Sequence, residues 1–368
     1  MIEQSKKYKI AIVAYNLDSG GLANVIENIF ILFKEIKDVN VELLLLDDSN
    51  KLALEGKVIS FGEYANIKSP FYKKINKYIQ FNKYIKKEKL DFIIDLRYRI
   101  NPITELLISK LIYKKTKVIY NVHSSKLETY LPKNTFLTNY LYRKAYKIVC
   151  VAKETEKLVI QKHHLKNTRT IYNPIDFEEI NKRKEENVDF NFEYILAVGR
   201  FVKLKQFDRL IKSYANSILP QKKVKLVLVG DGEELLHCKE LVLSLNLEDI
   251  VVFIGFSNNP YKYMKKGKFL VLSSKYEGFG LVLAEALACE TPVISFDLVS
   301  GPNEIIKQKH NGLLVENQNF EKLTEAIDLL FLDEELYTYC KSNAFESVQK
   351  FSFEEIKKEW LNLMQIKE

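Results

Sequence analysis

The sequence of 368 residues has no long apolar run and no regular spacing of cysteines. A helix that crosses a bilayer needs about 20 consecutive, mostly apolar residues, and no stretch approaches that length. The N-terminus reaches its first apolar stretch as a short strand and not as a leader peptide. Cys150, Cys238, Cys289 and Cys340 lie far apart, so they predict neither a zinc site nor a disulfide framework. We therefore expect a protein of the reducing cytoplasm.

Motifs for metal ions and nucleic acids are also lacking. No Asp-x-Asp occurs, and no cluster of His, Asp and Glu has the spacing of metal ligands. The sequence contains no recognised module that binds RNA or DNA, no repeat and no low-complexity tail. We therefore predict no metal, no cofactor and no nucleic-acid partner. A nucleic-acid binder stays an alternative only because of the positive charge described next.

The composition is that of a folded soluble protein, with 47% hydrophobic and 28% charged residues. The net charge of +8 is unevenly distributed. Residues 1–172 contain 31 Lys and Arg against 17 Asp and Glu, whereas residues 173–368 contain 25 against 31. The N-terminal half therefore predicts an anionic partner.

The densest basic region is the segment 68–89, KSPFYKKINKYIQFNKYIKKEK, which contains eight lysines and one glutamate. At helical spacing Ile75, Tyr78, Ile79 and Ile85 share one face, with lysines around the remainder. Such a helix can rest on an anionic membrane surface, where each basic residue contributes about 1 kcal/mol. The alternative is a solvated surface helix that binds no lipid.

Short apolar runs alternate with helical patterns along the whole chain. Runs of Val, Ile and Leu separated by helices are typical of parallel sheets that are buried on both faces. We predict an α/β protein with two doubly wound domains. The boundary lies near Asn173 and Pro174, where a charged run precedes the strand that starts at Tyr194. The predicted strands are KIAIVAY, VELLLL, DFIIDLR, KVIYNVH, KIVCVA and TRTIYNP, then YILAVGR, KLVLVGD, IVVFIGF, KFLVLSS, TPVISF and NGLLVE.

Ligands of such sheets bind beyond the carboxyl ends of the strands, so the residues after each strand are candidates for a site. After the first strand, Ser19, Gly20 and Gly21 precede a helix. Two glycines permit close approach of the backbone, and free N–H groups at a helix start can bind an anion. A plain strand-to-helix turn explains the same residues, because the three-glycine dinucleotide pattern is absent.

Two cations follow the first strand of the second domain. Arg200 lies at the strand end and Lys205 in the following loop, just before a helix. Such a pair can hold a diphosphate and neutralise its charge when it leaves, although an ordinary basic loop is the alternative. Gly230 and Gly232 follow the next strand. Without a third glycine, we interpret them as a strand-to-helix turn rather than a phosphate loop.

The segment SKYEGFGLVLAEALACETPVIS, residues 274–295, places two carboxylates around a glycine-containing loop. Glu277 lies in the loop after a strand, and Glu285 lies on the helix that follows. Gly278 and Gly280 let the loop backbone approach a ligand, and each carboxylate can accept hydrogen bonds from hydroxyl groups. The two carboxylates can hold two polyol parts of one ligand, with a helix-surface glutamate as the alternative for Glu285.

In this order and spacing, the motifs resemble those of the retaining glycosyltransferases of family 4. The resemblance covers nearly the whole chain, and the spacing of Glu277 and Glu285 matches the paired-glutamate motif of that family. It implies the GT-B fold, in which two Rossmann-like domains face each other across a cleft. The matching segments are SGGLANV, His123, VGRFVKLK, LVGDGEE, VVFIGF, YEGFGLVLAEALACETPVIS, GPNEII and NGLLVE.

The resemblance also implies a domain plan. An acceptor-side domain spans 1–178, a domain that binds the nucleotide-sugar donor spans 190–350, and a C-terminal helix at 351–368 crosses back to the first domain. That helix, SFEEIKKEWLNLMQIKE, is amphipathic, with Ser352 as its expected N-cap and Glu355 three residues further on. Its expected inward side chains are Ile356, Trp360, Leu361 and Leu363.

The roles implied by the resemblance fall on residues of both domains. Arg200 and Lys205 bind the donor diphosphate, Glu285 binds the nucleotide ribose, and Glu277 binds hydroxyls of the transferred sugar. His123 lies near the reacting sugar. The residues whose backbone approaches the donor are Gly20 and Gly21 in the first domain, and Phe279, Gly280 and Leu281 in the second.

Two residues depart from the family pattern. Gln206 follows Lys205 where a small residue is usual, and Glu290 follows Cys289 where glycine is common. If Glu290 adopts a left-handed conformation, it costs about 1 kcal/mol. Neither departure removes a charged motif residue, so we expect an active enzyme.

The resemblance implies a retaining, metal-independent hexosyl- or N-acetylhexosaminyltransferase. UDP is the expected donor nucleotide, by family frequency alone. The expected acceptor is a hydroxyl of a bacterial surface glycan, such as lipopolysaccharide or capsule, or of a lipid-linked oligosaccharide. An anionic lipid acceptor at the inner face of the cytoplasmic membrane fits the basic N-terminal half. A soluble transferase of the glycogen-synthase or sucrose type is the alternative, and it would have little use for the basic helix.

Overall fold

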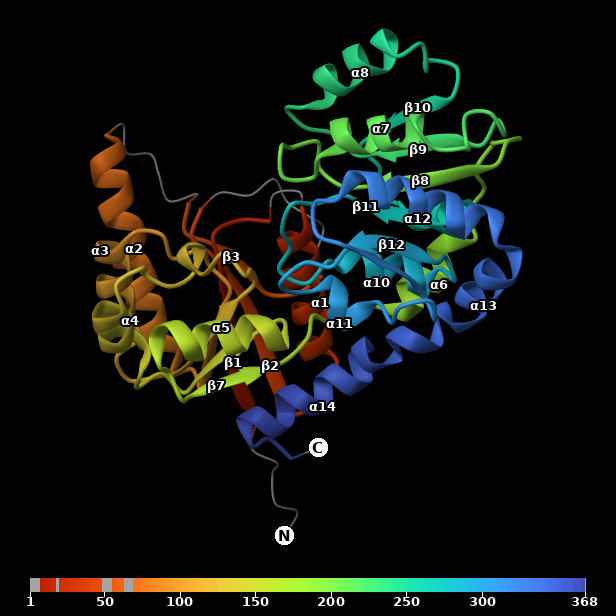
Figure 1. Cartoon of the computed structure of the whole chain (residues 1–368). Coiled ribbons are helices and arrows are strands. Elements are labelled where there is room, and N and C mark those ends of the chain that lie inside the picture. The colour runs from red at the N-terminus through yellow and green to blue at the C-terminus, as the bar shows by residue number, and fades with distance from the viewer. Residues whose placement is uncertain (1–6, 18–19, 48–54, 63–68, 368) are drawn as a thin grey trace. The chain divides into compact units, whose positions relative to one another are not determined.

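The computed structural model describes residues 7–17, 20–47, 55–62 and 69–367, so Ser19 and Lys68 of the predicted motifs lie outside the described residues. The chain divides into two compact units (Figure 1). The first unit comprises Met1–Pro174 and Ile356–Glu368, and the second comprises Ile175–Glu355. The roles that the resemblance gives to the two domains stay predictions. Within the described part of the chain, no helix has the length and apolarity of a membrane span.

The described strands of the first unit form a parallel sheet of seven strands in the order β3-β2-β1-β4-β5-β6-β7. The order reverses direction beside β1, as in doubly wound folds. Ile12 of β1 pairs with Leu43 of β2 and with Ile94 of β4, and all three are fully buried. The strands are β1 (Tyr8–Ala14), β2 (Val39–Leu45), β3 (Val58–Ser60), β4 (Phe92–Asp95), β5 (Lys117–Val122), β6 (Lys147–Cys150) and β7 (Thr168–Thr170).

Several of the described helical segments share one hydrophobic core with the sheet of the first unit. Phe81 of α2, Ile108 of η1, Leu141 of α4 and Val159 of α5 belong to this core. The segments of the unit are α1 (Gly21–Lys34), α2 (Pro70–Glu88), α3 (Pro102–Leu107), the π-helical η1 (Ile108–Ile112), the 3₁₀-helical η2 (Leu127–Thr129), α4 (Thr135–Tyr142), α5 (Lys153–His163) and most of α14 (Phe353–Met364).

The four residues that share one face of the basic helix at helical spacing are not all buried or all exposed. Ile85 is buried in α2, but Ile75 and Ile79 are exposed. The helix packs instead through Phe81, whose ring lies 5.3 Å from Phe61 and 6.0 Å from Tyr113, centroid to centroid. Aromatic rings bury more surface than an isoleucine does, so they decide which face turns inward.

The second unit repeats this plan with a six-stranded parallel sheet in the order β10-β9-β8-β11-β12-β13. The order reverses beside β8. Its strands are β8 (Tyr194–Val198), β9 (Lys225–Val229), β10 (Val251–Gly255), β11 (Leu270–Leu272), β12 (Val293–Phe296) and β13 (Gly312–Val315). Its helices are α6 (Phe177–Lys184), α7 (Phe207–Ala215), α8 (Leu235–Ser244), α9 (Tyr261–Lys266), α10 (Leu281–Ala288), α11 (Pro302–Ile305), α12 (Phe320–Leu332), α13 (Glu334–Ala344) and the 3₁₀-helical η3 (Glu346–Phe351).

The C-terminal helix α14 starts in the second unit and ends in the first. The predicted N-cap is confirmed, because the backbone N–H of Glu355 donates to the Ser352 hydroxyl at 3.3 Å. Trp360 is buried, and its ring lies edge-on to Phe33 of α1 at 5.7 Å between centroids. The Trp360 indole N–H has no hydrogen-bond partner among the described residues. The ring therefore contributes through packing.

Trp360→Ala should lower the free energy of unfolding by about 3 kcal/mol or more, because it opens a cavity beside Phe33. Chemical denaturation of the purified chain measures this change. Trp360→Phe is the control, since it keeps ring packing and removes a buried N–H that has no described partner. A loss below about 1 kcal/mol in the alanine variant would show that α14 is only loosely attached.

Candidate functional site

Two neighbouring strand exits of the second unit are tied together by hydrogen bonds. Strands β8 and β11 lie side by side at the point where the strand order reverses. The Ser273 hydroxyl after β11 donates to the Lys205 carbonyl oxygen at 2.7 Å, and the N–H of Lys275 donates to the Leu204 carbonyl oxygen at 2.9 Å. The loop after β8 is thus fixed to the loop after β11, at the edge where open α/β sheets bind ligands.

This junction brings Lys205 and Glu277 into direct contact. The Lys205 Nζ lies 2.6 Å from the Glu277 Oε1, and the two side chains are 18% and 14% exposed. Arg200, at the end of β8, is exposed, and no ion pair joins it to another described residue. The sequence predicted both cations and the carboxylate at one site, but it did not predict that Lys205 and Glu277 pair with each other.

The glycines after β9 are explained by close packing. A Cβ atom on Gly230 would lie 1.9 Å from the carbonyl oxygen of Gly199, and one on Gly232 would lie 2.4 Å from that of Phe201. Both glycines have positive φ angles. They let the turn between β9 and α8 pack against the backbone that leads to Lys205. This agrees with the prediction of a strand-to-helix turn.

The loop that carries Glu277 ends at the start of α10. Gly280 precedes this helix in a left-handed conformation, with φ 88°. The Phe279 side chain is buried and lies edge-on to Phe351, 5.1 Å between centroids. The loop backbone is further held by Ser300, whose hydroxyl donates to the Gly278 carbonyl oxygen at 3.0 Å. The ring of Phe279 therefore anchors the loop, while the N-terminus of α10, which begins at Leu281, offers backbone N–H groups.

Glu285 is a buried carboxylate and not a surface residue of α10, with only 8% of its surface exposed. Burial raises the pKa of Glu285 to about 7, although a hydrogen bond with the Tyr261 side chain of α9 opposes the shift. Hydroxyl donors from a ligand would stabilise the ionised form of this buried carboxylate, because they replace the water that burial removed.

Both departures from the family pattern adopt left-handed backbone conformations. Gln206 has φ 52° and Glu290 has φ 61°, which confirms the conformation considered for Glu290. The Glu290 carboxylate accepts from Lys184 at 3.0 Å and from Lys265 at 2.9 Å. Hydrogen bonds from these lysines lower the pKa of Glu290, and the bond from Lys265 has the larger effect. The two ion pairs join α6 and α9 to the end of α10 and offset the backbone strain.

The corresponding edge of the first unit contains Gly20 and Gly21. Gly20 has φ 140° and is the residue before α1. No described atom lies within 4 Å of a Cβ built on either glycine, so neither is required by packing. The open space is compatible with a ligand at the start of α1.

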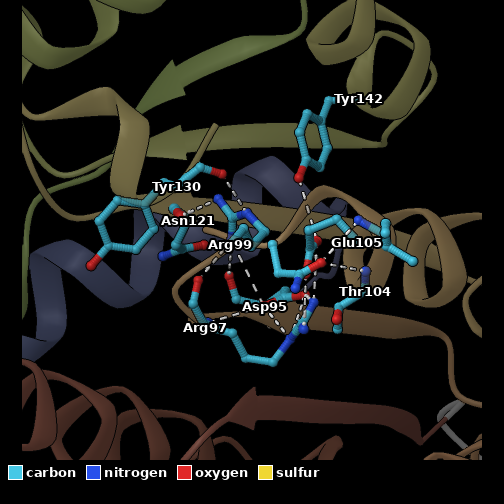
Figure 2. Close-up of polar contacts among 10 residues, drawn as sticks. Asp95, Arg97, Arg99, Thr104, Glu105, Asn121, Tyr130 and Tyr142 are labelled. Carbon is cyan, nitrogen blue, oxygen red and sulfur yellow. Dashed lines mark hydrogen bonds and ion pairs between the residues drawn. The ribbon is translucent and has the colours of Figure 1, made fainter. Parts of the chain in front are cut away.

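A buried cluster of charges follows β4, between the exits of β1 and β5 (Figure 2). Arg97 Nη2 lies 2.6 Å from Asp95 Oδ2, and Arg97 Nη1 lies 3.1 Å from Glu105 Oε1. All three side chains are at most 1% exposed. Burial opposes the charge of Arg97, but Asp95 and Glu105 outweigh it and raise its pKa above the usual range. This cluster was not predicted from the sequence.

Arg99 extends the cluster toward the exit of β5 (Figure 2). Its guanidinium donates to the carbonyl oxygens of Asn121 at 2.7 Å and Tyr130 at 2.9 Å. It also lies over the rings of Tyr120 and Tyr142, 5.2 and 5.8 Å from their centroids. Asn121 and Tyr130 flank the loop of His123, so Arg99 fixes both ends of that loop.

His123 directly follows β5, and both of its ring nitrogens are buried without a hydrogen-bond partner among the described residues. Burial and the nearby positive charge of Arg99 lower the pKa of His123 to about 3. The imidazole is therefore neutral near pH 7 and keeps one donor and one acceptor for a ligand.

The predicted site residues thus form two groups, each at the carboxyl edge of one sheet. His123, Gly20 and Gly21 lie in the first unit, and the others lie in the second. Among the described residues, no three His, Cys, Asp or Glu side chains are grouped so that they could hold a metal ion.

Comparisons with known proteins match both units. The family model described as "Glycosyltransferase Family 4" matches residues 19–179, and the model "Glycosyl transferases group 1" matches residues 178–347. The N-acetylgalactosamine-N,N'-diacetylbacillosaminyl-diphospho-undecaprenol 4-alpha-N-acetylgalactosaminyltransferase of Campylobacter jejuni is 30% identical, covering 93% of this chain and 95% of its own.

Two further proteins are similar over most of their length. The amylovoran biosynthesis glycosyltransferase AmsD of Erwinia amylovora is 28% identical, covering 78% of this chain and 81% of its own. The crystal structure of Anabaena HepE in complex with UDP has a TM-score of 0.78 and 21% identity, covering 97% of this chain and 99% of that chain. At this identity the structure shows a common fold.

The raised pKa of Glu285 predicts a pH-dependent stability difference between the wild type and Glu285→Gln. The carboxyl group has an ordinary pKa near 4.5 when unfolded and about 7 when folded, so the folded state holds the proton more tightly. This contribution is present at pH 5 and is lost as the pH rises through 7. The glutamine variant should therefore gain about 2–3 kcal/mol relative to wild type between pH 5 and pH 8. The free energy of unfolding of both proteins is measured by urea denaturation at each pH. A difference between the two proteins that stays constant from pH 5 to pH 8 would contradict the raised pKa of Glu285.

Proposed function

This chain belongs to the GT-B glycosyltransferases of the family 4 and group 1 type, and from that premise we propose that it is a retaining enzyme that uses a nucleotide-diphosphate sugar. The GT-B fold predicted from the sequence is confirmed. The proposed acceptor is a hydroxyl of a bacterial surface glycan or a lipid-linked oligosaccharide. One observation carries the proposed donor site: Lys205, Glu277 and Arg200 follow the two adjacent strands β8 and β11.

In the proposed reaction, the bond between the anomeric carbon and the donor phosphate breaks while the acceptor oxygen bonds to that carbon from the same face. The acceptor proton passes to the leaving phosphate oxygen. Arg200 and Lys205 stabilise the negative charge that grows on the diphosphate, so that these fixed cations do the work of a metal ion. The backbone N–H groups at the start of α10 add to this stabilisation.

The ion pair between Lys205 and Glu277 supports separate roles for the two residues in binding the diphosphate and the sugar. At 2.6 Å and with both side chains partly exposed, the pair holds each group in place and stays accessible to a ligand. The diphosphate takes up contacts with Lys205, and hydroxyls of the sugar donate to Glu277. Glu277 is not proposed as a nucleophile, because one of its oxygens is already engaged by an ammonium group.

Two further groups of the proposed site bind donor parts. Glu285 accepts hydrogen bonds from the ribose hydroxyls, which favours its ionised form and repays the cost of its burial. In the first unit, neutral His123 bonds to the reacting sugar, and the backbone at Gly20 and Gly21 approaches the diphosphate. The cluster around Arg99 positions His123 through Asn121 and Tyr130.

The relatives support the choice of donor and acceptor. HepE is a solved complex with UDP, the C. jejuni relative is named for transfer to a saccharide on diphospho-undecaprenol, and AmsD is named for amylovoran biosynthesis. We take UDP as the donor nucleotide and a glycan on an anionic lipid as the acceptor. The proposed place of work is the cytoplasm, at the inner face of the cytoplasmic membrane, with the basic segment 68–89 toward the lipid.

Removing either cation should damage turnover. Arg200→Ala and Lys205→Ala should each lower kcat by about 10²–10³, because the charge on the leaving diphosphate loses a fixed partner. The measurement is release of UDP from UDP-N-acetylgalactosamine or UDP-glucose, with a bacterial lipid extract as acceptor. Lys203→Ala is the matched control, since Lys203 is an exposed lysine of the same loop. Turnover equal to that of the wild type in Arg200→Ala would contradict the proposal that Arg200 binds the donor diphosphate.

A further inference from the structure

Several large apolar side chains are exposed on one helical layer of the first unit. Helix α3 continues into η1, and η1 contacts α2. On its other side η1 reaches α4, where the Lys110 ammonium donates to the Tyr140 carbonyl oxygen at 2.6 Å. Ile103 of α3 and Phe136 of α4 are 81% and 83% exposed. Further exposed apolar side chains of this layer, called here the α2–α4 face, are Ile75, Ile79, Ile100, Leu106 and Leu111.

The charges around this face are almost all positive. Residues 69–145 contain 17 Lys and Arg but five Asp and Glu. Two of the five acids, Asp95 and Glu105, are buried in ion pairs with Arg97. The other three, Glu88, Asp91 and Glu128, are half-buried, whereas lysines such as Lys74, Lys83, Lys114 and Lys133 are exposed.

An exposed apolar surface of this kind marks a contact site. Protein interfaces are depleted of lysine, so a lysine-rich surround favours a different partner. Anionic lipid headgroups attract lysines, and the boundary below them takes up large apolar side chains. The combination of projecting isoleucine and phenylalanine with a surround in which lysines greatly outnumber the partly exposed acids matches such a surface.

We propose that the α2–α4 face docks on an anionic phospholipid bilayer, with Ile103 and Phe136 inserted below the headgroups and the surrounding lysines at the phosphates. Besides the basic helix, α3 and α4 then contact the bilayer, although their sequence carried no such prediction. Only the role of this docking, which is to bring the enzyme to a lipid-linked acceptor, rests on the proposed function. Binding itself requires neither donor nor acceptor.

Flotation of the purified full chain with vesicles tests the proposal. Vesicles of phosphatidylcholine mixed with phosphatidylglycerol should carry the protein upward, and vesicles of phosphatidylcholine alone should not. Raising the salt concentration should weaken the binding, because it screens the lysines. The double variant Ile103→Ser with Phe136→Ser should lose about tenfold in partition, since the inserted side chains are removed. Both positions are exposed, so thermal melting should find the variant folded.

The matched control is Leu236→Ser in α8 of the second unit, where Leu236 is 73% exposed but lies outside the α2–α4 face. It should float like the wild type. Equal flotation of the double variant and the wild type would overturn the proposal, as would self-association in gel filtration that the double variant abolishes. The assay contains no nucleotide sugar, so a failure of the proposed reaction and a failure of docking appear in separate experiments.

Discussion

Parallel strand pairing is the constraint on which the rest of the structure depends. Because all strands of a sheet run in one direction, every strand exit of a unit lies at the same edge. Lys205 and Glu277 are 72 residues apart in the sequence, yet they meet at 2.6 Å because β8 and β11 are neighbours there. The same geometry places the loop of His123 next to the exit of β4, where Arg99 binds both of its ends. Each proposed role follows from which strands are adjacent.

The charged groups at the sheet edges of the two units differ in burial. In the first unit, the cluster around Arg97 is buried and balanced, with two arginines and two carboxylates, so it is costly to disturb and holds neighbouring strand exits in one arrangement. In the second unit, the pair of Lys205 and Glu277 stays partly exposed. A ligand can therefore take over its contacts at little cost. The first arrangement suits a scaffold, and the second suits a binding site.

Much of the fold could be predicted from the sequence, and the misses have physical reasons. Each of the twelve apolar runs contains a strand, and every one of these strands except β7 (Thr168–Thr170) contains the Val, Ile or Leu that buried parallel strands need. Strand β3 was missed because Val58–Ser60 is only three residues long and lies at the sheet edge.

The charged cluster was missed although Asp95, Arg97 and Arg99 alternate along the chain. This spacing could have indicated one side of an extended chain, yet a charged run is ordinarily solvated. Periodicity grouped Ile79 with the buried Ile85 on α2, but it could not show that the helix packs on the core through Phe81 and leaves Ile79 exposed. The positions of Glu277 and Glu285 came from motif spacing, but burial of Glu285 and its raised pKa need the tertiary environment.

The most direct test of the central claim, that the edge after β8 and β11 binds a nucleotide sugar, is thermal stability of the purified protein with UDP, GDP, ADP, CMP and their common sugar conjugates. A ligand at a hundred times its Kd should stabilise the fold by about 2.7 kcal/mol. We predict a response to UDP and its conjugates that persists without magnesium, is lost in Glu285→Ala and is kept in Lys203→Ala. No response to any nucleotide, or an undiminished response in Glu285→Ala, would contradict it.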